Sequence, residues 1–250
     1  MKRKFLAVFL LAVIGAALIP FENSLQAEQK AAGFRATKLD LPLRQQIGQM
    51  GYLAALSGFR SPLAMYTFLE ANEAWANTQW SKVQSLLEQT TTLQPRSRAY
   101  WDLAAWHMAW NASQAAMDDP KQPSEFLRKR AQHAYFDLGR DFLEKGIENI
   151  PDDYYLYQKL GELYRQKYED HCKAAEAYKK AAEFEKSPDY VKRFYGYELA
   201  QCPGHEKEAY EYLRKRYEMG DKERLPSLIN YLKKLENDLD VPEAERIKSE

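Results

Sequence analysis

The sequence feature that most constrains the fold is a proline followed six residues later by an aromatic side chain. The pairs are Pro62 and Phe68, Pro95 and Trp101, Pro151 and Tyr157, and Pro188 and Phe194. Successive prolines are 33, 56 and 37 residues apart, and a period of roughly 20 to 50 residues is the signature of repeated supersecondary units. Proline is tolerated in the first turn of a helix, where an aromatic residue one turn later can pack against neighbouring helices. We therefore expect an all-α chain of repeated helix pairs, each opened by one of these prolines.

The prolines divide most of the chain into units, which we place at 62–94, 95–150, 151–187 and 188–219. The second unit is the longest, and we expect its extra residues as an insertion at 117–124. The 11 glycines and 11 prolines are few, whereas the 17 tyrosines and 11 phenylalanines are many. This composition favours packed helices over a turn-rich β-sandwich.

Two further helices are expected outside these units. An apolar stripe at three- and four-residue spacing predicts a leading helix within 42–61 that Gly58 can end; its members are Leu43, Ile47, Met50, Leu53 and Ala54. A second stripe predicts a helix over 222–236, within a C-terminal segment at 220–250; its members are Leu225, Leu228, Ile229, Leu232 and Leu235. A last helix with one polar face would cap the open end of a stack of repeats.

The third unit carries the most specific pattern. Its first half contains Tyr157, Leu160, Gly161 and Tyr164, and its second half Ala174, Tyr178 and Ala181 before Pro188. With this pattern the chain resembles the tetratricopeptide repeat superfamily over residues 62–219, with one strong unit and three degenerate ones. The stretches LSGFRSPLA, LQPRSRAYWDLAAWHMAWN and CPGHEKEAYEYL are also similar to a family of uncharacterised bacterial tetratricopeptide proteins with an N-terminal hydrophobic segment. The superfamily resemblance implies a short right-handed α-solenoid whose concave groove binds peptides or assembles complexes.

The N-terminus carries a targeting signal. Three basic residues, Lys2, Arg3 and Lys4, precede an apolar run from Phe5 to Ile19, as in a secretory signal or an N-terminal anchor. We assign 1–21 as signal peptide or membrane anchor and 22–41 as a linker. The run is at the short edge of what spans a bilayer, so cleavage and retention both remain open. The expected location is the bacterial cell envelope, either anchored in the inner membrane through residues 5–21 and facing the periplasm, or soluble in the periplasm.

Charge and motifs argue against several function classes. Lysine plus arginine and aspartate plus glutamate number 36 each, so no net field attracts the chain to nucleic acid. The sequence contains no P-loop, dinucleotide-binding or nucleophile-elbow motif, and neither His107 nor His133 has metal-binding spacing. We expect no enzyme activity, cofactor or resident metal, and place both histidines in packing or surface positions.

The two cysteines, Cys172 and Cys202, admit three interpretations. In an exported protein they are most simply a disulfide, because in a repeat stack both would lie in turns along one edge of adjacent units. A structural zinc site that adds His205 and possibly His171 is a second interpretation. Two unpaired small core residues are the third.

A partner-binding groove follows from the helical register. If Trp101 packs inward, then Asp102, Trp106 and Ala109 face the concave side. The same register adds further residues to the groove: Tyr66, Leu69 and Glu73 in the first unit, and Tyr155, Gln158, Glu162 and Arg165 in the third. The alternative for Trp106 is packing under the inserted loop at 117–124. A mixed, partly aromatic lining suits an extended or helical peptide.

These observations lead to two functional hypotheses. The first is a non-catalytic scaffold or adaptor that presents its groove to a protein or peptide partner. The second is a periplasmic glycan-binding protein or cell-wall-associated hydrolase, in which Asp102 and Glu162 would act as acid and base across a cleft.

Overall fold

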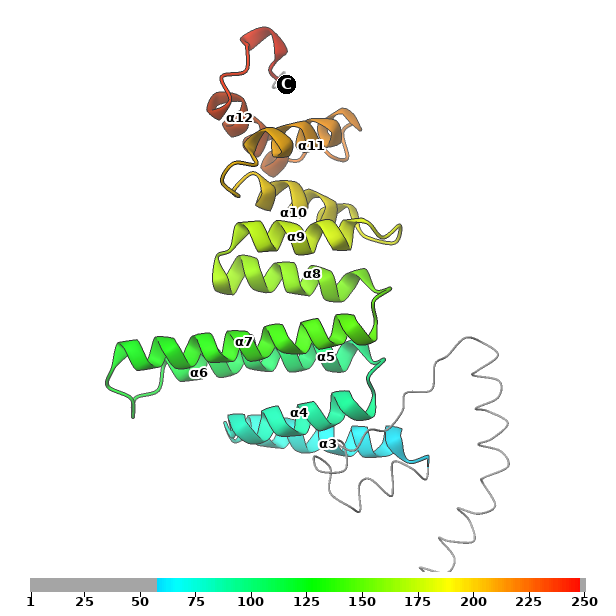
Figure 1. Cartoon of the computed structure of the whole chain (residues 1–250), viewed down its shortest axis with the longest axis vertical. Helices are drawn as coiled ribbons and strands as arrows, with labels where there is room; N and C mark the ends of the chain where they lie inside the picture. Colours follow the sequence, from blue (N-terminus) through cyan, green and yellow to red (C-terminus); the bar gives the residue numbers. More distant parts are fainter. Residues whose placement is uncertain (1–57, 248–250) are drawn as a thin grey trace, which may run out of the picture. The chain divides into compact units, whose positions relative to one another are not determined.

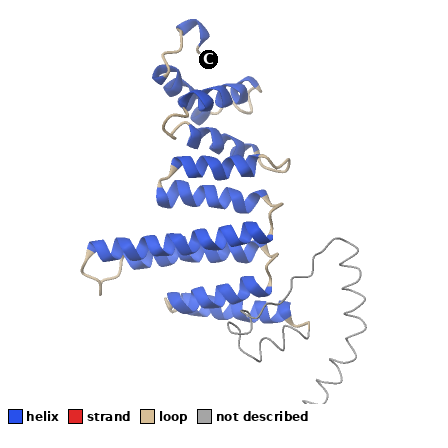
Figure 2. Ribbon diagram, viewed as in Figure 1, coloured by secondary structure: helices blue, strands red, loops and turns tan. Residues whose placement is uncertain are grey.

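The computed structural model describes residues 58–247, in which every regular element is helical (Figures 1 and 2). The all-α prediction is confirmed for these residues. The chain divides into two compact units, Met1–Pro95 and Arg96–Glu250. In the structure, the first and second unit are these two parts and not the four shorter units expected from the sequence. The N-terminal segment 1–21, the linker 22–41 and nearly all of the leading helix within 42–61 lie outside the described residues. Within 58–247, no helix is both long enough and apolar enough to cross a bilayer.

The described part of the first unit is a hairpin of α3 (Arg60–Ala76) and α4 (Trp80–Leu93). The helices are joined by a three-residue turn in which Thr78 has a φ of 55°, and so short a turn folds α4 back along α3. The buried contact is made largely by small residues of α3 against aliphatic residues of α4: Ala64, Ala71 and Ala74, with Val83 and Leu87. The buried hydroxyl oxygens of Thr67 and Thr90 lie 2.8 Å apart, so this interface also satisfies its polar groups.

The second unit begins with a pair of long helical segments. The first runs without a break through α5 (Arg98–Trp106), a π-helical turn η1 (His107–Ala112) and α6 (Ser113–Met117). The second is α7 (Glu125–Asn149), and α6 packs against it (Figure 1). The insertion expected at 117–124 coincides with the connection between α6 and α7, which comprises residues 118–124. The rest of the extra length is helical and lengthens both helical segments.

Glycine makes the contact between these two segments close. A Cβ added at Gly139 of α7 would lie 2.5 Å from the Cβ of Ala109, and one added at Gly146 would lie 2.9 Å from the Trp101 ring. Trp101 is thus packed against a position where no side chain fits.

The next pair consists of α8 (Tyr154–Leu163), extended by a second π-helical turn η2 (Tyr164–Tyr168), and α9 (His171–Ala182). Both helices begin at an aspartate whose carboxylate accepts a backbone N–H. Asp153 accepts from Tyr155 at 2.9 Å, and Asp170 accepts from Lys173 at 3.0 Å. Such N-caps satisfy donors that the first turn of a helix leaves unpaired.

The chain ends with α10 (Asp189–Leu199), α11 (Glu206–Glu218), α12 (Pro226–Asp238) and a short 3-10 turn η3 (Glu243–Glu245). The helix expected over 222–236 is present but begins at Pro226. Its inner face is buried through Leu228, Leu232 and Leu235, whereas Leu225 is the exposed N-cap residue. In the second unit each helix packs chiefly on its neighbours in the chain, from α7 on α8 through to α11 on α12.

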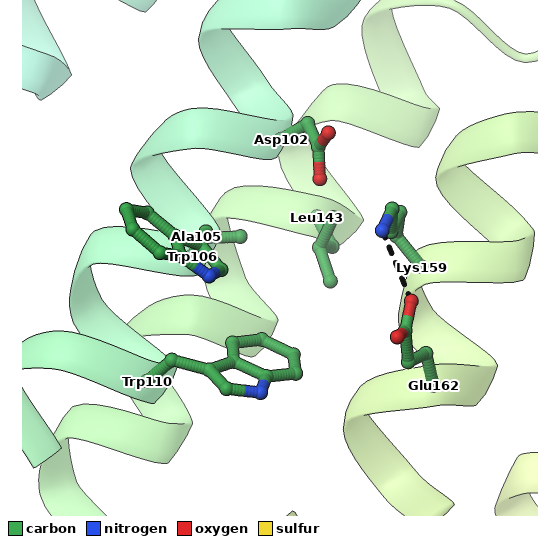
Figure 3. Close-up of a pocket in the computed structure, with 7 residues that line it drawn as sticks. All are labelled: Asp102, Ala105, Trp106, Trp110, Leu143, Lys159 and Glu162. Carbon is green, nitrogen blue, oxygen red and sulfur yellow. Dashed lines mark hydrogen bonds and ion pairs between the residues drawn. The ribbon is translucent and has the colours of Figure 1, made fainter. Parts of the chain in front are cut away.

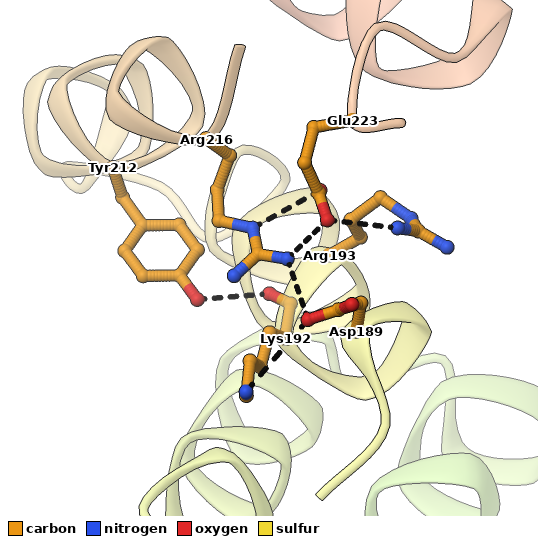
Figure 4. Close-up of polar contacts among 6 residues, drawn as sticks. All are labelled: Asp189, Lys192, Arg193, Tyr212, Arg216 and Glu223. Atoms are coloured by element: carbon orange, nitrogen blue, oxygen red, sulfur yellow. Dashed lines mark hydrogen bonds and ion pairs between the residues drawn. The ribbon is translucent and has the colours of Figure 1, made fainter. Parts of the chain in front are cut away.

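Two polar or covalent links join the last helices. A disulfide connects Cys172, at the start of α9, to Cys202, just after α10, with their Cα atoms 4.8 Å apart. A buried ion cluster joins α10, α11 and the turn before α12 (Figure 4). In it, Glu223 accepts from Arg216 Nε at 3.1 Å and from Arg193 at 3.2 Å, and Arg216 also reaches Asp189 at 3.2 Å.

The repeated prolines do not all sit where the sequence suggested. Only Pro62 lies in the first turn of a helix. Pro95 and Pro151 lie in turns that precede α5 and α8, and Pro188 is the residue before α10. For Pro151 the reason is capping: Asp153 follows it and provides a better helix start, since its side chain accepts a backbone N–H.

Candidate functional site

The second unit has a pocket between α5, η1, α7 and α8 (Figure 3). Its volume is about 140 Å³, and its lining residues are Asp102, Ala105, Trp106, Trp110, Leu143, Lys159 and Glu162. Three of them, Asp102, Trp106 and Glu162, are residues that the sequence placed in the groove. They come from two helices more than 50 positions apart in the chain, so the fold has brought them together.

One wall of the pocket is aromatic. The indoles of Trp106 and Trp110 lie along it, and the buried Leu143 lies behind them (Figure 3). Trp106 keeps 42% of its surface exposed, although its ring also contacts that of His107, with the centroids 5.1 Å apart. Large aromatic residues usually bury more of their surface in a folded chain, so an indole half open to solvent beside a pocket is a candidate contact for a ligand.

The alternative position for Trp106, under the loop after α6, does not match the structure. Met117, where that loop begins, is 11 residues further along the same helical segment, which corresponds to about 16 Å at the rise of an α-helix. Trp106 instead faces the pocket shared with α8 (Figure 3).

The opposite wall is polar. Lys159 donates to Glu162 at 3.0 Å, and Gln166 donates to the other oxygen of Glu162 at 3.1 Å. Burial alone lowers the pKa of Lys159, but the hydrogen bond to Glu162 and nearby carboxylates outweigh it, so the pKa is raised and the ammonium is retained. Trp110 connects the two walls, because its indole N–H donates to Gln166 at 3.4 Å.

Asp102 lies at one end of the pocket and is held by a tyrosine. The Tyr155 hydroxyl donates to its carboxylate at 2.7 Å. Burial and this hydrogen bond raise the pKa of Tyr155 to about 12, so its proton stays on the phenol at neutral pH. Arg98 and Lys159 each lie over the Tyr155 ring, at 4.8 and 5.5 Å from its centroid. Tyr155 is thus held through both its hydroxyl and its ring, and its hydrogen bond fixes the position of the Asp102 carboxylate.

The other predicted groove residues lie elsewhere. Gln158 is buried and accepts a hydrogen bond from Tyr190 of α10 at 3.1 Å. Arg165 lies over the Phe194 ring at 4.8 Å and 3.9 Å from Glu198, so it too faces α10. Tyr66 and Glu73 belong to α3 in the first unit, where both side chains are exposed.

The cysteines and histidines do not assemble a metal site. Both sulfurs are bonded to each other, and His171 and His205 pair with Glu198 and Glu208 at 2.8 and 3.1 Å. Among residues 58–247 there is no group of three or more potential ligands that could hold a metal ion. His107 is buried, with a pKa lowered by that burial, and His133 is an exposed residue of α7 that contacts Phe136.

Sequence reasoning did not assign four of the lining residues to the groove: Ala105, Trp110, Leu143 and Lys159. Lys159 was detectable as the partner of Glu162 three positions later on the same helix face. The π-helical turns η1 and η2 were not, because nothing in residue type distinguishes a wider turn. Both lie at this site, since η1 carries Trp110 and η2 carries Gln166, and such turns are often found at functional positions. Neither models of known protein families nor a search of curated proteins gives a match to the chain.

Proposed function

We propose that this protein is a non-catalytic adaptor of the bacterial cell envelope, built as a tetratricopeptide-like α-solenoid, that binds a peptide segment of a partner protein at the Trp106 pocket. The observation that carries the proposal is Trp106 itself, a 42% exposed indole beside a preformed pocket with polar groups on the facing wall. Protein interfaces concentrate their binding energy in such aromatic anchors. A pocket of about 140 Å³ accommodates one side chain of a partner rather than a whole small ligand.

The packing order of the second unit supports the repeat architecture. Each helix contacts its neighbours in the chain, and the helices are joined by short turns, which is how a quasi-one-dimensional array is built. In such an array α5 and α8 are the first helices of adjacent units, and both contribute to the pocket. Export to the envelope rests on the basic N-terminus and the apolar run that follows it.

The hydrolase alternative has less support. A general acid needs a carboxyl group that can give a proton to substrate, but Glu162 accepts from both Lys159 and Gln166, and Asp102 accepts from Tyr155. These contacts occupy carboxylate oxygens and hold both side chains in place. They suit recognition of polar groups on a ligand better than proton transfer.

The test is partner capture from detergent-solubilised envelope by the full-length protein and by Trp106→Ala. Phe126→Ala is the matched control, because Phe126 is also an exposed aromatic but lies on α7 away from the pocket. The partner segment is then identified by cross-linking and synthesised, and its affinity for each variant is measured by isothermal titration calorimetry. We expect Trp106→Ala to weaken binding by about 30-fold, the size of a typical interface hot spot, and Phe126→Ala to leave it unchanged.

Two results would overturn the proposal. Equal binding by Trp106→Ala and wild type would remove the pocket from the interface. Saturable binding of soluble peptidoglycan fragments that requires Trp106, with no protein captured, would favour the glycan-binding alternative, and their turnover lost in Asp102→Asn would favour the hydrolase.

A further inference from the structure

The first unit exposes an apolar stripe on the side of α3 that faces away from α4. Met65, Tyr66 and Leu69 are 52%, 60% and 58% exposed. At 100° per residue they lie opposite the buried Ala64, Ala71 and Ala74. Phe59, just before the helix, is also exposed. Contiguous exposed side chains of this size mark a surface that another element covers.

The chain itself supplies an apolar face of matching length. Residues 42–56 carry an amphipathic pattern whose apolar members are Leu43, Ile47, Met50, Leu53 and Ala54. Gly58 adds an independent observation, because its φ of 82° is the left-handed conformation that commonly ends a helix. The next helix, α3, starts at Arg60. A helix end followed so soon by a helix start is an αα-hairpin turn, which brings the two helices side by side and antiparallel.

The two apolar faces are also in register. Met50 and Tyr66 are each eight residues from Gly58, and Ile47 and Leu69 are each eleven residues from it. Since both helices rise by the same amount per residue, residues at equal distance from the turn come to the same height in an antiparallel pair. Two of the exposed side chains of α3, Tyr66 and Leu69, therefore have an apolar counterpart opposite them.

We infer that the exposed stripe of α3 is an intramolecular docking surface, and that its occupant is the segment 42–56, packed as an antiparallel helix with Met50 opposite Tyr66 and Ile47 opposite Leu69. The occupant is covalently tethered two residues from the surface, so its effective concentration exceeds that of any free partner. Tyr66 and Leu69 are then covered by this segment and do not belong to a partner-binding groove. The inference does not depend on the Trp106 pocket.

The test is cross-linking in the full-length protein with the double variant Met50→Cys, Tyr66→Cys. The matched control is Met50→Cys, Ser85→Cys, because Ser85 is an exposed residue of α4 and lies away from the stripe. Thiol pairs are joined by a short bismaleimide, and the linked peptides are quantified by mass spectrometry. We expect the first pair to link within one chain on the order of tenfold faster than the control, as for groups held in proximity.

Equal linking rates for the two pairs, or no intrachain link although both introduced thiols react with a monofunctional maleimide, would overturn the inference. Links between two chains would also overturn it, because a second copy would then be the occupant. A second measurement covers the case in which a cysteine variant does not fold. In the wild-type chain the amides of residues 47–54 should be protected from hydrogen exchange, and Leu69→Asp should remove that protection while α8 and α9 stay protected.

Discussion

At the scale of single residues, the close contact between α7 and the α5–η1 segment depends on a glycine, Gly139. A Cβ at position 139 would approach the Cβ of Ala109 to 2.5 Å and the carbonyl oxygen of Ala105 to 3.0 Å. Alanine is the better helix former by about 1 kcal/mol, but overpacking of this kind costs about 1–3 kcal/mol and moves the helices apart. We expect Gly139→Ala to lower the free energy of unfolding, measured with urea and circular dichroism.

The control for this effect is a second substitution that reopens the space. Ala109→Gly in the Gly139→Ala background removes the nearer of the two clashing atoms. The double variant should recover part of the lost stability, although Ala109→Gly alone destabilises. If the double variant lost the sum of the stabilities lost by the two single variants, the helices would not touch at this point.

Tyr155 provides a prediction that depends on pH. Its pKa is raised to about 12 by burial and by its hydrogen bond to Asp102, compared with about 10 in an unfolded chain. The folded state therefore holds this proton more tightly, and the associated stability is complete below about pH 10 and lost as the pH rises to about 12. Tyr155→Phe should cost about 1 kcal/mol at neutral pH, and the difference from wild type should shrink over that alkaline range.

The stability of wild type must be compared with that of Tyr155→Phe, because the pKa values of other tyrosines are raised as well. Burial, with hydrogen bonds to carboxylates, also raises the pKa values of Tyr168 and Tyr195, and these contributions cancel between wild type and variant. A difference in unfolding free energy that stays constant up to pH 12 would show that the Asp102 contact is not formed.

The residues of the candidate site show what helical register predicts and what it leaves open. Once Trp101 is placed inward, the 100° period of the helix predicts that Asp102, Trp106 and Glu162 face the groove. The same period predicts that Gln158 and Arg165 face the groove, but both contact α10. The reason is that α8 lies between two neighbouring pairs and has two polar faces, one towards α5 and one towards α10. Periodicity identifies a face but not the neighbour that it meets.

At the scale of elements, the ion cluster of Arg216 and Glu223 holds α12 against the preceding helices. Both side chains are buried, and Glu223 also binds Arg193 (Figure 4). Arg216→Met removes one partner and leaves a buried carboxylate with less compensation, which costs about 3 kcal/mol. Arg214→Met is the matched control on the same helix, because its ion pair with Glu218 at 3.4 Å is largely exposed and is worth at most about 1 kcal/mol.

The measurement is the urea dependence of unfolding, combined with hydrogen exchange in residues 228–235. Arg216→Met should increase exchange there, since the turn before α12 loses its anchor. If the two arginine variants were equally stable, the cluster would contribute no more than a surface pair.

The disulfide acts between elements as well. It closes a segment of 30 residues between Cys172 and Cys202, and a loop of this size restricts the unfolded chain by about 3 kcal/mol. The double variant Cys172→Ala, Cys202→Ala should lose about 2–4 kcal/mol of unfolding free energy. A reductant should destabilise wild type by a similar amount and leave the variant unchanged. Two reactive thiols in the folded wild-type chain would contradict the bridge.

Helices were the most predictable elements and their connections the least. The apolar stripes located α12, α8 and α9 because the buried residues of these helices recur at helical spacing. The inserted loop expected at 117–124 falls on the connection between α6 and α7, residues 118–124, whereas the rest of the extra length between Pro95 and Pro151 extends these two helices. A proline marks the neighbourhood of a helix start, whereas at α8 the capping side chain of Asp153 decides the residue at which the helix begins.

At the scale of the whole molecule, the two units should differ in their ability to fold alone. A chain of fewer than about 40 residues seldom buries enough surface to be stable, and the described part of the first unit, the α3–α4 hairpin, is of that size. The second unit has a continuous core that includes Tyr178, Leu213, Leu228 and Leu232. We expect residues 96–250 to unfold cooperatively on heating and residues 58–95 to show no transition, as followed by circular dichroism.

Since every residue that lines the pocket lies between Asp102 and Glu162, the 96–250 fragment should also bind the partner segment with wild-type affinity. A fragment that folds but has lost that affinity would place part of the binding site before residue 96, whereas a fragment without a thermal transition would mean that its core requires the preceding residues.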